Sequence, residues 1–239
     1  MSVVLLVYFF IMPTSPQSSI RDKFVQSVRL RLIRSGMDAS YFFGAKEFSD
    51  SICNAMRRGS LLLNGFEAST IMHLVRSTAK LEGEIAELGT YQGGSAHLIC
   101  EVKGNTPLHL FDTFEGLPNA TDADSGSGFA KGMFVSSEQR VRDYLVSFPS
   151  VFLHRGYFPG TAGPIEDKRF RLVHLDADLY EATKAGLDFF YPRMVRQGVI
   201  LIHDCGAAGV ERAYTEFLAD KPEVLLFQPA GFHCLRVKA

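Results

Sequence analysis

From residue 83 onward, apolar strand-like runs alternate with helical patterns. Such alternation predicts a parallel sheet covered by helices on both faces, which is an α/β fold. The expected strands span residues 83–89, 108–114, 151–156, 170–178, 198–204, 224–229 and 233–238. The expected helices span residues 93–102, 136–148, 179–195 and 209–219.

The end of the chain breaks this alternation. Only three residues, Ala230, Gly231 and Phe232, separate the last two expected strands. A parallel crossover needs a dozen residues or more, so these two strands are expected to pair antiparallel. The prediction is therefore a seven-stranded, mostly parallel sheet with a C-terminal antiparallel hairpin.

Residues 1–82 are expected to form an N-terminal helical extension or lid on a domain of residues 83–239. Helical patterns cover about residues 19–34, 49–62 and 67–80, and the first of them is basic and amphipathic. A solvated basic face and a surface for an acidic substrate or a membrane are both open interpretations of that pattern. The apolar run at residues 3–12 is too short to span a bilayer as a helix, and its flanks do not fit a signal peptide. We expect no stable membrane span.

Charge and cysteine content narrow the function classes. The formal net charge of −1 argues against broad electrostatic binding of nucleic acid. The four cysteines, Cys53, Cys100, Cys205 and Cys234, form no closely spaced pair of the kind that zinc sites use. Reduced thiols in a cytoplasmic protein are the favoured interpretation.

A glycine-containing turn follows the first expected strand. Gly89 can adopt a positive φ and leaves no Cβ to obstruct a ligand. Gly93, Gly94 and Ser95 open the next helix, whose first N–H groups can bind polar or anionic groups of a ligand. The glycine spacing does not match the dinucleotide pattern G-x-G-x-x-G, which disfavours a nicotinamide oxidoreductase.

Acidic side chains follow several of the expected strands. Ligands of open α/β sheets collect at the carboxyl ends of the strands, near the point where the strand order reverses. Asp112 ends the second strand, where an acid can accept hydrogen bonds from both hydroxyls of a ribose. A turn or cap role for Asp112 is the alternative.

The sharper acidic group consists of Asp176, Asp178 and Asp204, with His203 beside them. Three carboxylates in one crevice repel one another unless a cation lies among them, and hard oxygen ligands suit Mg²⁺. Separate capping roles for each aspartate are the alternative. His203 could be a packing residue, a metal ligand, an orienting residue or a proton acceptor near neutral pH.

The run from Glu84 to about Phe217 resembles the macrocin-type O-methyltransferases (the TylF/MycF/NovP group). These are class I enzymes that use S-adenosylmethionine and a metal to methylate sugar hydroxyls of antibiotics. The matching motifs follow one another over more than half of the chain: Ala86-Glu87-Leu88-Gly89-x-x-x-Gly93-Gly94, Asp112-x-Phe114-Glu115-Gly116-Leu117-Pro118, Gly156-Tyr157-Phe158-Pro159-Gly160-Thr161, Leu175-Asp176-Ala177-Asp178-Leu179-Tyr180-Glu181-Ala182-Thr183, and Asp204-Cys205-Gly206 before Glu216-Phe217.

The resemblance implies a Rossmann-like class I methyltransferase fold with S-adenosylmethionine as cofactor, held by the first loop with Asp112 on its ribose. The cofactor-binding residues expected on this basis are Glu87, Gly89, Thr90, Tyr91, Gly93, Ser95, Asp112, Thr113 and Asp176. The resemblance also implies Mg²⁺ at the strand ends, and the expected metal ligands are Asp176, His203 and Asp204. It implies Asp178 as the catalytic base, and His203 is a second candidate for catalysis. Family members typically have Asp-Asp where this chain has His203-Asp204.

The leading hypothesis is methyl transfer to a hydroxyl of a sugar, a glycoside or a related small molecule. Related enzymes assemble through their N-terminal helices, so a homo-oligomer is expected. One rival is a metal-independent methyltransferase of the same fold with His203 as base. The other is a protein that binds S-adenosylmethionine without catalysis.

Overall fold

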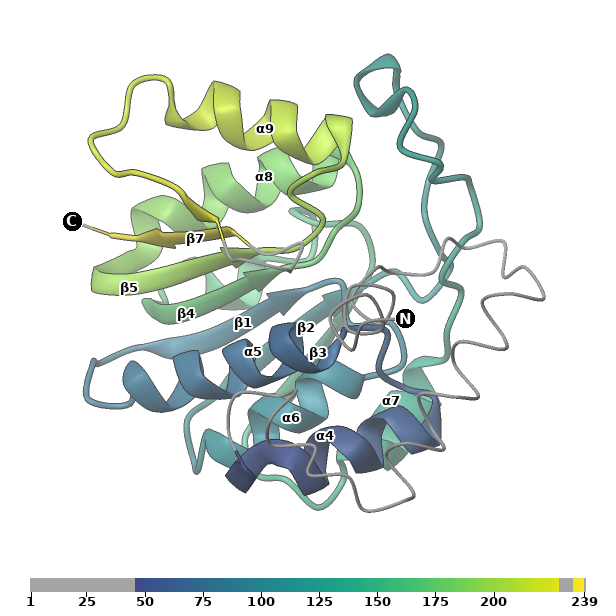
Figure 1. Ribbon diagram of the computed structural model, residues 1–239, viewed down its shortest axis with the longest axis vertical. Coiled ribbons are helices and arrows are strands. Elements are labelled where there is room, and N and C mark those ends of the chain that lie inside the picture. The colour runs from purple at the N-terminus through teal and green to yellow at the C-terminus, as the bar shows by residue number, and fades with distance from the viewer. Residues whose placement is uncertain (1–45, 228–233, 239) are drawn as a thin grey trace, which may run out of the picture.

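The computed structural model describes residues 46–227 and 234–238 (Figure 1). The patterns at residues 3–12 and 19–34 lie outside this part of the chain. The helices are α4 (Lys46–Arg58), α5 (Gly65–Ser77), α6 (Gly94–Val102), α7 (Glu138–Leu145), α8 (Tyr180–Phe190) and α9 (Ala208–Leu218), with single turns η1 (Asp122–Asp124), η2 (Gly163–Ile165) and η3 (Tyr191–Arg193). The strands are β1 (Glu84–Leu88), β2 (Leu108–Asp112), β3 (Val151–Arg155), β4 (Phe170–Leu175), β5 (Met194–Ile202), β6 (Leu226–Phe227) and β7 (Cys234–Val237).

Five parallel strands form the body of the sheet, as predicted. The full strand order is β3-β2-β1-β4-β5-β7-β6, in which β7 runs antiparallel to β5 and β6 antiparallel to β7. The closing strands expected at residues 224–229 and 233–238 are shorter than predicted, because β6 has only two residues and β7 only four. The turn of the expected hairpin, at residues 228–233, lies outside the described residues.

The order reverses between β1 and β4, because the chain proceeds from β1 to β2 and β3 on one side and from β4 to β5 on the other. Such a reversal opens a crevice at the carboxyl ends of the strands. The fold therefore places the crevice beside the residues that follow β1, β4 and β5.

One expected boundary is wrong for a physical reason. The helix predicted over residues 179–195 ends at Phe190, and β5 already begins at Met194. Pro192 lies in the intervening turn η3. Proline removes a backbone donor and clashes with the preceding helical turn, so the helix cannot continue through it.

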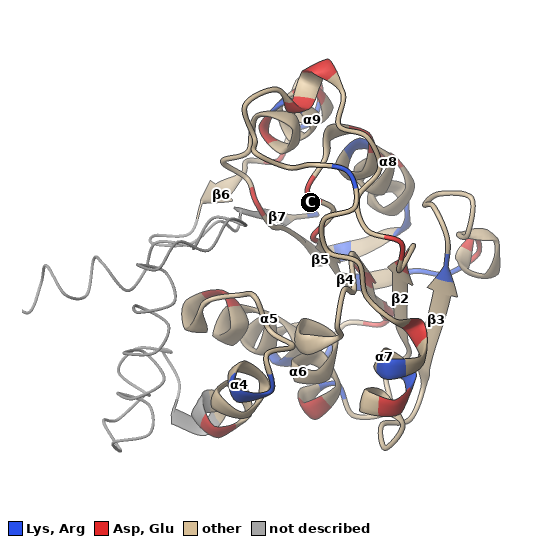
Figure 2. Ribbon diagram, turned by 90° about the vertical axis from the view of Figure 1, so that its right-hand side faces the viewer, with Lys and Arg blue, Asp and Glu red and all other residues tan. Residues whose placement is uncertain are grey.

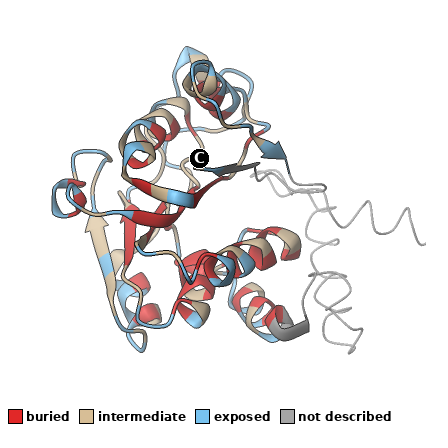
Figure 3. Cartoon of the chain, turned by 90° about the vertical axis from the view of Figure 1, so that its left-hand side faces the viewer, coloured by how far each residue is buried: buried red, intermediate tan, exposed pale blue. Residues whose placement is uncertain are grey.

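Helices cover both faces of the sheet. Figure 1 shows α4, α5, α6 and α7 on one face and α8 and α9 on the other. Neighbouring apolar side chains of β1 and β4 point to opposite faces, so that Ile85 and Leu172 pack in a cluster on the first face while Ala86 and Val173 pack in a cluster on the second. Burial on both faces explains the nearly continuous apolar runs of the strands, and Figure 3 shows buried residues along the central strands.

Helices α4 and α5 share this core although they precede residue 82. Phe48, Ile52 and Met72 belong to the same buried cluster as Ile85 of β1. The buried guanidinium of Arg171 in β4 also donates hydrogen bonds to α5 and the residue after it. A functional division at residue 82 remains a prediction.

Figure 2 shows basic and acidic residues interspersed over the helices, with no single basic face on the side it displays. Among the described helices, none has the length and apolar character needed to cross a membrane. Cys53, Cys100 and Cys205 are buried free thiols, and burial raises the pKa of Cys100 to about 12.

Candidate active site

The predicted acidic group does come together at the carboxyl ends of β4 and β5. These strands are parallel neighbours, so the residues after them meet at one edge of the sheet. Asp176 and Asp178 follow β4, and His203 and Asp204 follow β5. The backbone N–H of Asp176 donates to the last residue of β1, and that of His203 donates to the last residue of β4, both at 2.8 Å. The positions of these side chains are therefore set by the sheet itself.

Asp176, His203 and Asp204 form a compact group that could hold a metal ion. The Nδ1 atom of His203 lies 2.9 Å from Oδ1 of Asp176 and 3.1 Å from Oδ2 of Asp204. Neighbouring ligands of an octahedral ion with bonds of about 2.1 Å lie about 3.0 Å apart, so these separations fit one ion. The same separations also fit a protonated imidazole hydrogen-bonded to both carboxylates.

Asp178 completes the group. It adopts a left-handed conformation (φ +62°), which aspartate tolerates better than most residues, and its side chain lies close enough to that of Asp204 to be affected by it. Two carboxylates in contact cannot both carry a full charge without repulsion. Burial, followed by the charges of Asp176 and Asp204, accordingly raises the pKa of Asp178 well above its usual range.

The histidine has the opposite balance. Burial alone would lower the pKa of His203, but the carboxylates of Asp176 and Asp204 hold it well above the usual range. Burial likewise opposes ionisation of Asp176, but the charge and the hydrogen bond of His203 together with the charge of His174 outweigh it and lower the pKa of Asp176. His203 and Asp176 therefore each favour the charged form of the other.

A fifth side chain, Glu67, was not expected in the site. It lies in the first turn of α5 and is 3% exposed, with Oε1 3.7 Å from Nε2 of His203. Its sequence signal is the capping box Asn64-x-x-Glu67, in which Oε2 accepts a hydrogen bond from the backbone N–H of Asn64 at 2.8 Å. That pattern predicts where the helix begins. It gives no sign that the other carboxylate oxygen of Glu67 lies near His203, which follows a strand far along the chain.

The loop after β1 lies on the other side of the crevice. Thr90 and Tyr91 each donate a backbone N–H to Oδ2 of Asp112, at 2.9 and 2.6 Å. Phe114 donates its backbone N–H to Oδ1 of the same carboxylate at 2.7 Å. Asp112 therefore fixes two loops, which is the turn role that the sequence left open, and Oδ1 keeps capacity for a further donor. A ribose hydroxyl fits that remaining position.

Glu87 is fully buried in β1. Its Oε1 lies 2.9 Å from Nδ1 of His174 in β4, and burial raises the pKa of Glu87. Ser95, in the first turn of α6, acts in the opposite direction and lowers the pKa of this carboxylate. The contact between Glu87 and His174 therefore ties β1 to β4 beneath the loop.

Gly89 has the expected positive φ of +93°, but its missing Cβ makes room for protein. A Cβ there would lie 1.8 Å from the carbonyl oxygen of Asp176. Gly93 caps α6 with φ +79°, and its backbone N–H already donates to the carbonyl oxygen of Thr90. Both positions have a positive φ that favours glycine. Gly89 also allows the loop after β1, where the cofactor is expected, to pack directly against Asp176 of the expected metal site.

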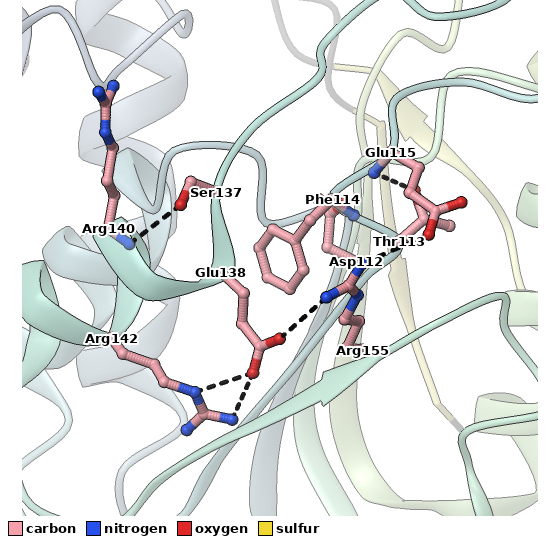
Figure 4. A network of polar contacts seen from close by, with 9 residues as sticks. All are labelled: Asp112, Thr113, Phe114, Glu115, Ser137, Glu138, Arg140, Arg142 and Arg155. Atoms are coloured by element: carbon pink, nitrogen blue, oxygen red, sulfur yellow. Dashed lines mark hydrogen bonds and ion pairs between the residues drawn. The ribbon is translucent and has the colours of Figure 1, made fainter.

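Figure 4 shows how the loop after β2 is held at its outer side. Thr113 Oγ1 accepts the backbone N–H of Glu115 at 3.1 Å. Arg155, at the end of β3, lies 3.4 Å from Glu115 and 3.9 Å from Glu138 of α7. These exposed ion pairs contribute little individually, but they connect β2, β3 and α7 around the place where Asp112 ends its strand.

A long loop between β2 and α7 (teal in Figure 1) contacts the start of α8. Its turn η1 carries Asp124, which is 3% exposed and accepts backbone N–H groups from Thr121 and from Tyr180 at the start of α8. Gly209 of α9 lies directly against the same carboxylate. The loop is therefore fastened two residues from Asp178.

Comparison with known proteins gives one family. The macrocin-O-methyltransferase (TylF) family model matches residues 66–223. A tetracenomycin-C 4′-O-methyltransferase of Streptomyces olivaceus is 27% identical over 137 residues, which cover 51% of this chain and 52% of that protein. The match thus spans about half the length of this curated relative.

Solved structures agree on the fold. The O-methyltransferase NovP superposes with a TM-score of 0.69 at 18% identity, covering 90% of this chain and 99% of NovP. The calicheamicin methyltransferase CalS11 gives 0.69 and 18%, covering 92% and 94%. An O-methyltransferase from Bacillus cereus, solved with SAH, gives 0.56 and 13%, covering 86% and 100%. The architecture is therefore the Rossmann-like methyltransferase fold, and the chain belongs to the macrocin-O-methyltransferase (TylF) family.

Proposed function

We propose that this protein is an S-adenosylmethionine-dependent O-methyltransferase that acts on a hydroxyl of a sugar or a related small molecule with the help of a divalent cation. The observation that carries the proposal is the cluster of Asp176, Asp178, His203 and Asp204 in the crevice beside the β1 loop. The printed names of two relatives support a sugar acceptor: one acts on a rhamnosyl tetracenomycin, and CalS11 is named as a TDP-rhamnose 3′-O-methyltransferase.

The cofactor would lie along the loops after β1 and β2. Asp112 would accept a ribose hydroxyl at Oδ1, while Thr90 and Tyr91 hold its Oδ2. Glu87, Gly89, Gly93 and Ser95 would support the loop from below, and Thr113 would line its outer side. The chemistry that S-adenosylmethionine supplies is an electrophilic methyl group, which passes to the acceptor oxygen as the C–S bond breaks and the C–O bond forms.

Asp178 would accept the proton that the acceptor hydroxyl loses. A base is most effective when its pKa lies close to the working pH, and burial with two neighbouring acids moves the pKa of Asp178 in that direction. Asp176, His203 and Asp204 would hold the cation, and Mg²⁺ is the ion that the resemblance to the family implies. The chemistry such an ion supplies when bound is Lewis acidity, which makes an acceptor hydroxyl easier to deprotonate.

The substitution Asp178→Asn tests the assignment of the base. Asparagine has the same shape and tolerates the left-handed conformation, so the fold should persist. We expect transfer of labelled methyl groups to a panel of free and nucleotide-linked rhamnosides to fall by about 10²-fold or more, with SAH affinity unchanged by calorimetry. Asp188→Asn, on the exposed side of α8, is the matched control and should keep full activity. Full activity in Asp178→Asn would reject this role.

A second candidate is a metal-independent methyltransferase with His203 as the base. The contact of Nδ1 with two carboxylates favours it, because such contacts suit a histidine that takes up a proton. Treatment with a chelator separates the candidates: the metal-dependent enzyme loses activity and regains it with added cation, whereas the other is unaffected. A homo-oligomer and a cytoplasmic location remain predictions from the sequence.

A further inference from the structure

Glu67 brings a buried carboxylate from α5 to a histidine at the end of β5. One of its oxygens, Oε2, accepts the backbone N–H of Asn64 and so fixes the side chain at the start of the helix. The other oxygen, Oε1, lies 3.7 Å from Nε2 of His203. The carboxylate therefore faces the histidine from a position that the helix cap determines.

The two nitrogens of His203 consequently have different surroundings. Nδ1 contacts the carboxylates of Asp176 and Asp204, whereas Nε2 faces Glu67. A metal-bound histidine uses one nitrogen for the ion and donates the N–H of the other, usually to a carboxylate or a carbonyl group. The arrangement leaves Nδ1 as the nitrogen available to an ion that binds Asp176 and Asp204.

We propose that Glu67 is a positioning residue that orients His203 with Nδ1 toward the crevice, and that the resulting site binds Mn²⁺ or Co²⁺ more tightly than Mg²⁺. The ligand set would be one imidazole nitrogen and two carboxylate oxygens. Mg²⁺ prefers oxygen ligands and keeps several waters, whereas the affinity of a mixed nitrogen and oxygen site for the first-row transition metals rises from Mn²⁺ to Co²⁺. The proposal rests on the proposed function for the presence of a cation, but ion binding can be measured without turnover.

The proposal also predicts that the effect of Glu67 on cation binding depends on whether residue 203 is histidine or aspartate. With histidine there, Glu67 faces a group that can donate a proton or carry a positive charge. With aspartate there, the same carboxylate would face a like charge and raise the cost of the site. Glu67→Gln should therefore weaken cation binding in the wild-type protein and strengthen it in a His203→Asp background.

The experiment titrates metal-free full-length protein with Mn²⁺, following the free-ion electron paramagnetic resonance signal, and measures Mg²⁺ by competition. The d–d absorption of bound Co²⁺ depends on the ligand field, so a shift between the wild type and His203→Asp reports the loss of a nitrogen ligand. We expect the wild type to prefer Mn²⁺ over Mg²⁺ by more than about tenfold, and His203→Asp to lose most of that preference. Glu67→Gln should weaken Mn²⁺ binding by about 10- to 100-fold.

Glutamine can still accept the hydrogen bond of the capping box, so Glu67→Gln should fold normally. The matched control is Glu84→Gln, which alters another glutamate–histidine contact, 2.6 Å from His109, at the opposite end of β1. It should leave Mn²⁺ affinity unchanged. Melting temperatures measured in the presence of chelator show whether Glu67→Gln is folded. If it is not, the preference for Mn²⁺ over Mg²⁺ in the wild type and in His203→Asp tests the proposal instead.

Equal affinity of the wild type for Mn²⁺ and Mg²⁺, no measurable Mn²⁺ binding, or unchanged Mn²⁺ affinity in Glu67→Gln would each overturn the proposal. A reduced affinity of Glu67→Gln in both backgrounds would also overturn it, because the charge argument requires opposite signs. Intact ion selectivity in a protein that transfers no methyl group would instead refute the proposed function alone.

Discussion

Replacing Gly89 with alanine tests whether the close passage of two strand ends builds the site. Gly89 has φ +93°, and a Cβ there would lie 1.8 Å from the carbonyl oxygen of Asp176 and 2.8 Å from its carbonyl carbon. Real Cβ atoms essentially never approach a heavy atom closer than 3.0 Å. Because interiors are close-packed, the backbone of Asp176 or of the loop must move by roughly 1 Å.

Two costs add in this variant. A left-handed conformation costs alanine about 1–2 kcal/mol, and overpacking costs about 1–3 kcal/mol. We therefore expect the free energy of unfolding to fall by about 2–5 kcal/mol. Since Oδ1 of Asp176 lies 2.9 Å from Nδ1 of His203, the same movement separates the cluster, and a misplacement of this size can reduce methyl transfer by about 10²-fold.

Urea unfolding followed by circular dichroism measures the stability term. The matched control is Gly104→Ala, because Gly104 has a similar left-handed φ of +60° but no atom within 4 Å of an added Cβ. It should show the conformational cost alone, about 1–2 kcal/mol. If Gly89→Ala loses no more stability than Gly104→Ala, the close approach is not a constraint and the reasoning fails.

Two further variants address the loop fastening and the outer edge of the sheet. Asp124→Ala removes the acceptor of the Tyr180 backbone N–H, so the free energy of unfolding should fall by about 1–3 kcal/mol. Proteolysis within residues 122–131 should accelerate, and an unchanged cleavage pattern would contradict this prediction. Burial lowers the pKa values of His109 and His154, whose Nδ1 and Nε2 atoms lie 3.0 Å apart, with Glu84 and Lys168 as the charged neighbours of His109. The unfolded chain then binds more protons, so stability is full above about pH 6.5 and falls below it, by up to about 1.4 kcal/mol per pH unit for each histidine. His154→Gln should reduce that slope in urea titrations between pH 7 and 5.5, and an unaltered slope would refute the assignment.

The parallel part of the fold could be predicted because more than half of the residues of each parallel strand are apolar and a polar turn follows each strand. Burial between two helical layers favours apolar residues in β1, β2 and β4, and the buried polar residues among them, such as Glu87, His109 and Arg171, do not obscure that pattern. The ends of helices and strands were harder to predict where the apolar pattern continues beyond the element. Pro192 ends a helix that the apolar pattern would extend, and β6 has only two residues although the pattern allowed six.

The acidic site could be predicted in part, because residues that follow parallel strands must meet at one edge of the sheet. Asp176, Asp178, His203 and Asp204 are brought together by that rule alone. Glu67 could not be found in this way, because its neighbour depends on how α5 packs across the sheet. The capping box accounts for the hydrogen bond that Oε2 of Glu67 accepts from Asn64, and it does not predict the position of Oε1 near His203.

Gly89 shows that a glycine can be predicted at the right place for the wrong physical reason. Gly89 was expected to clear space for a ligand, yet the space is taken by the carbonyl group of Asp176. The backbone N–H of Asp176 in turn donates to the last residue of β1 at 2.8 Å, so the β1 loop and the acid cluster are one packed unit. A substitution in the loop that is expected to affect only the cofactor should therefore also affect the cation. For that reason cation affinity and cofactor affinity should be measured together in every variant of this loop.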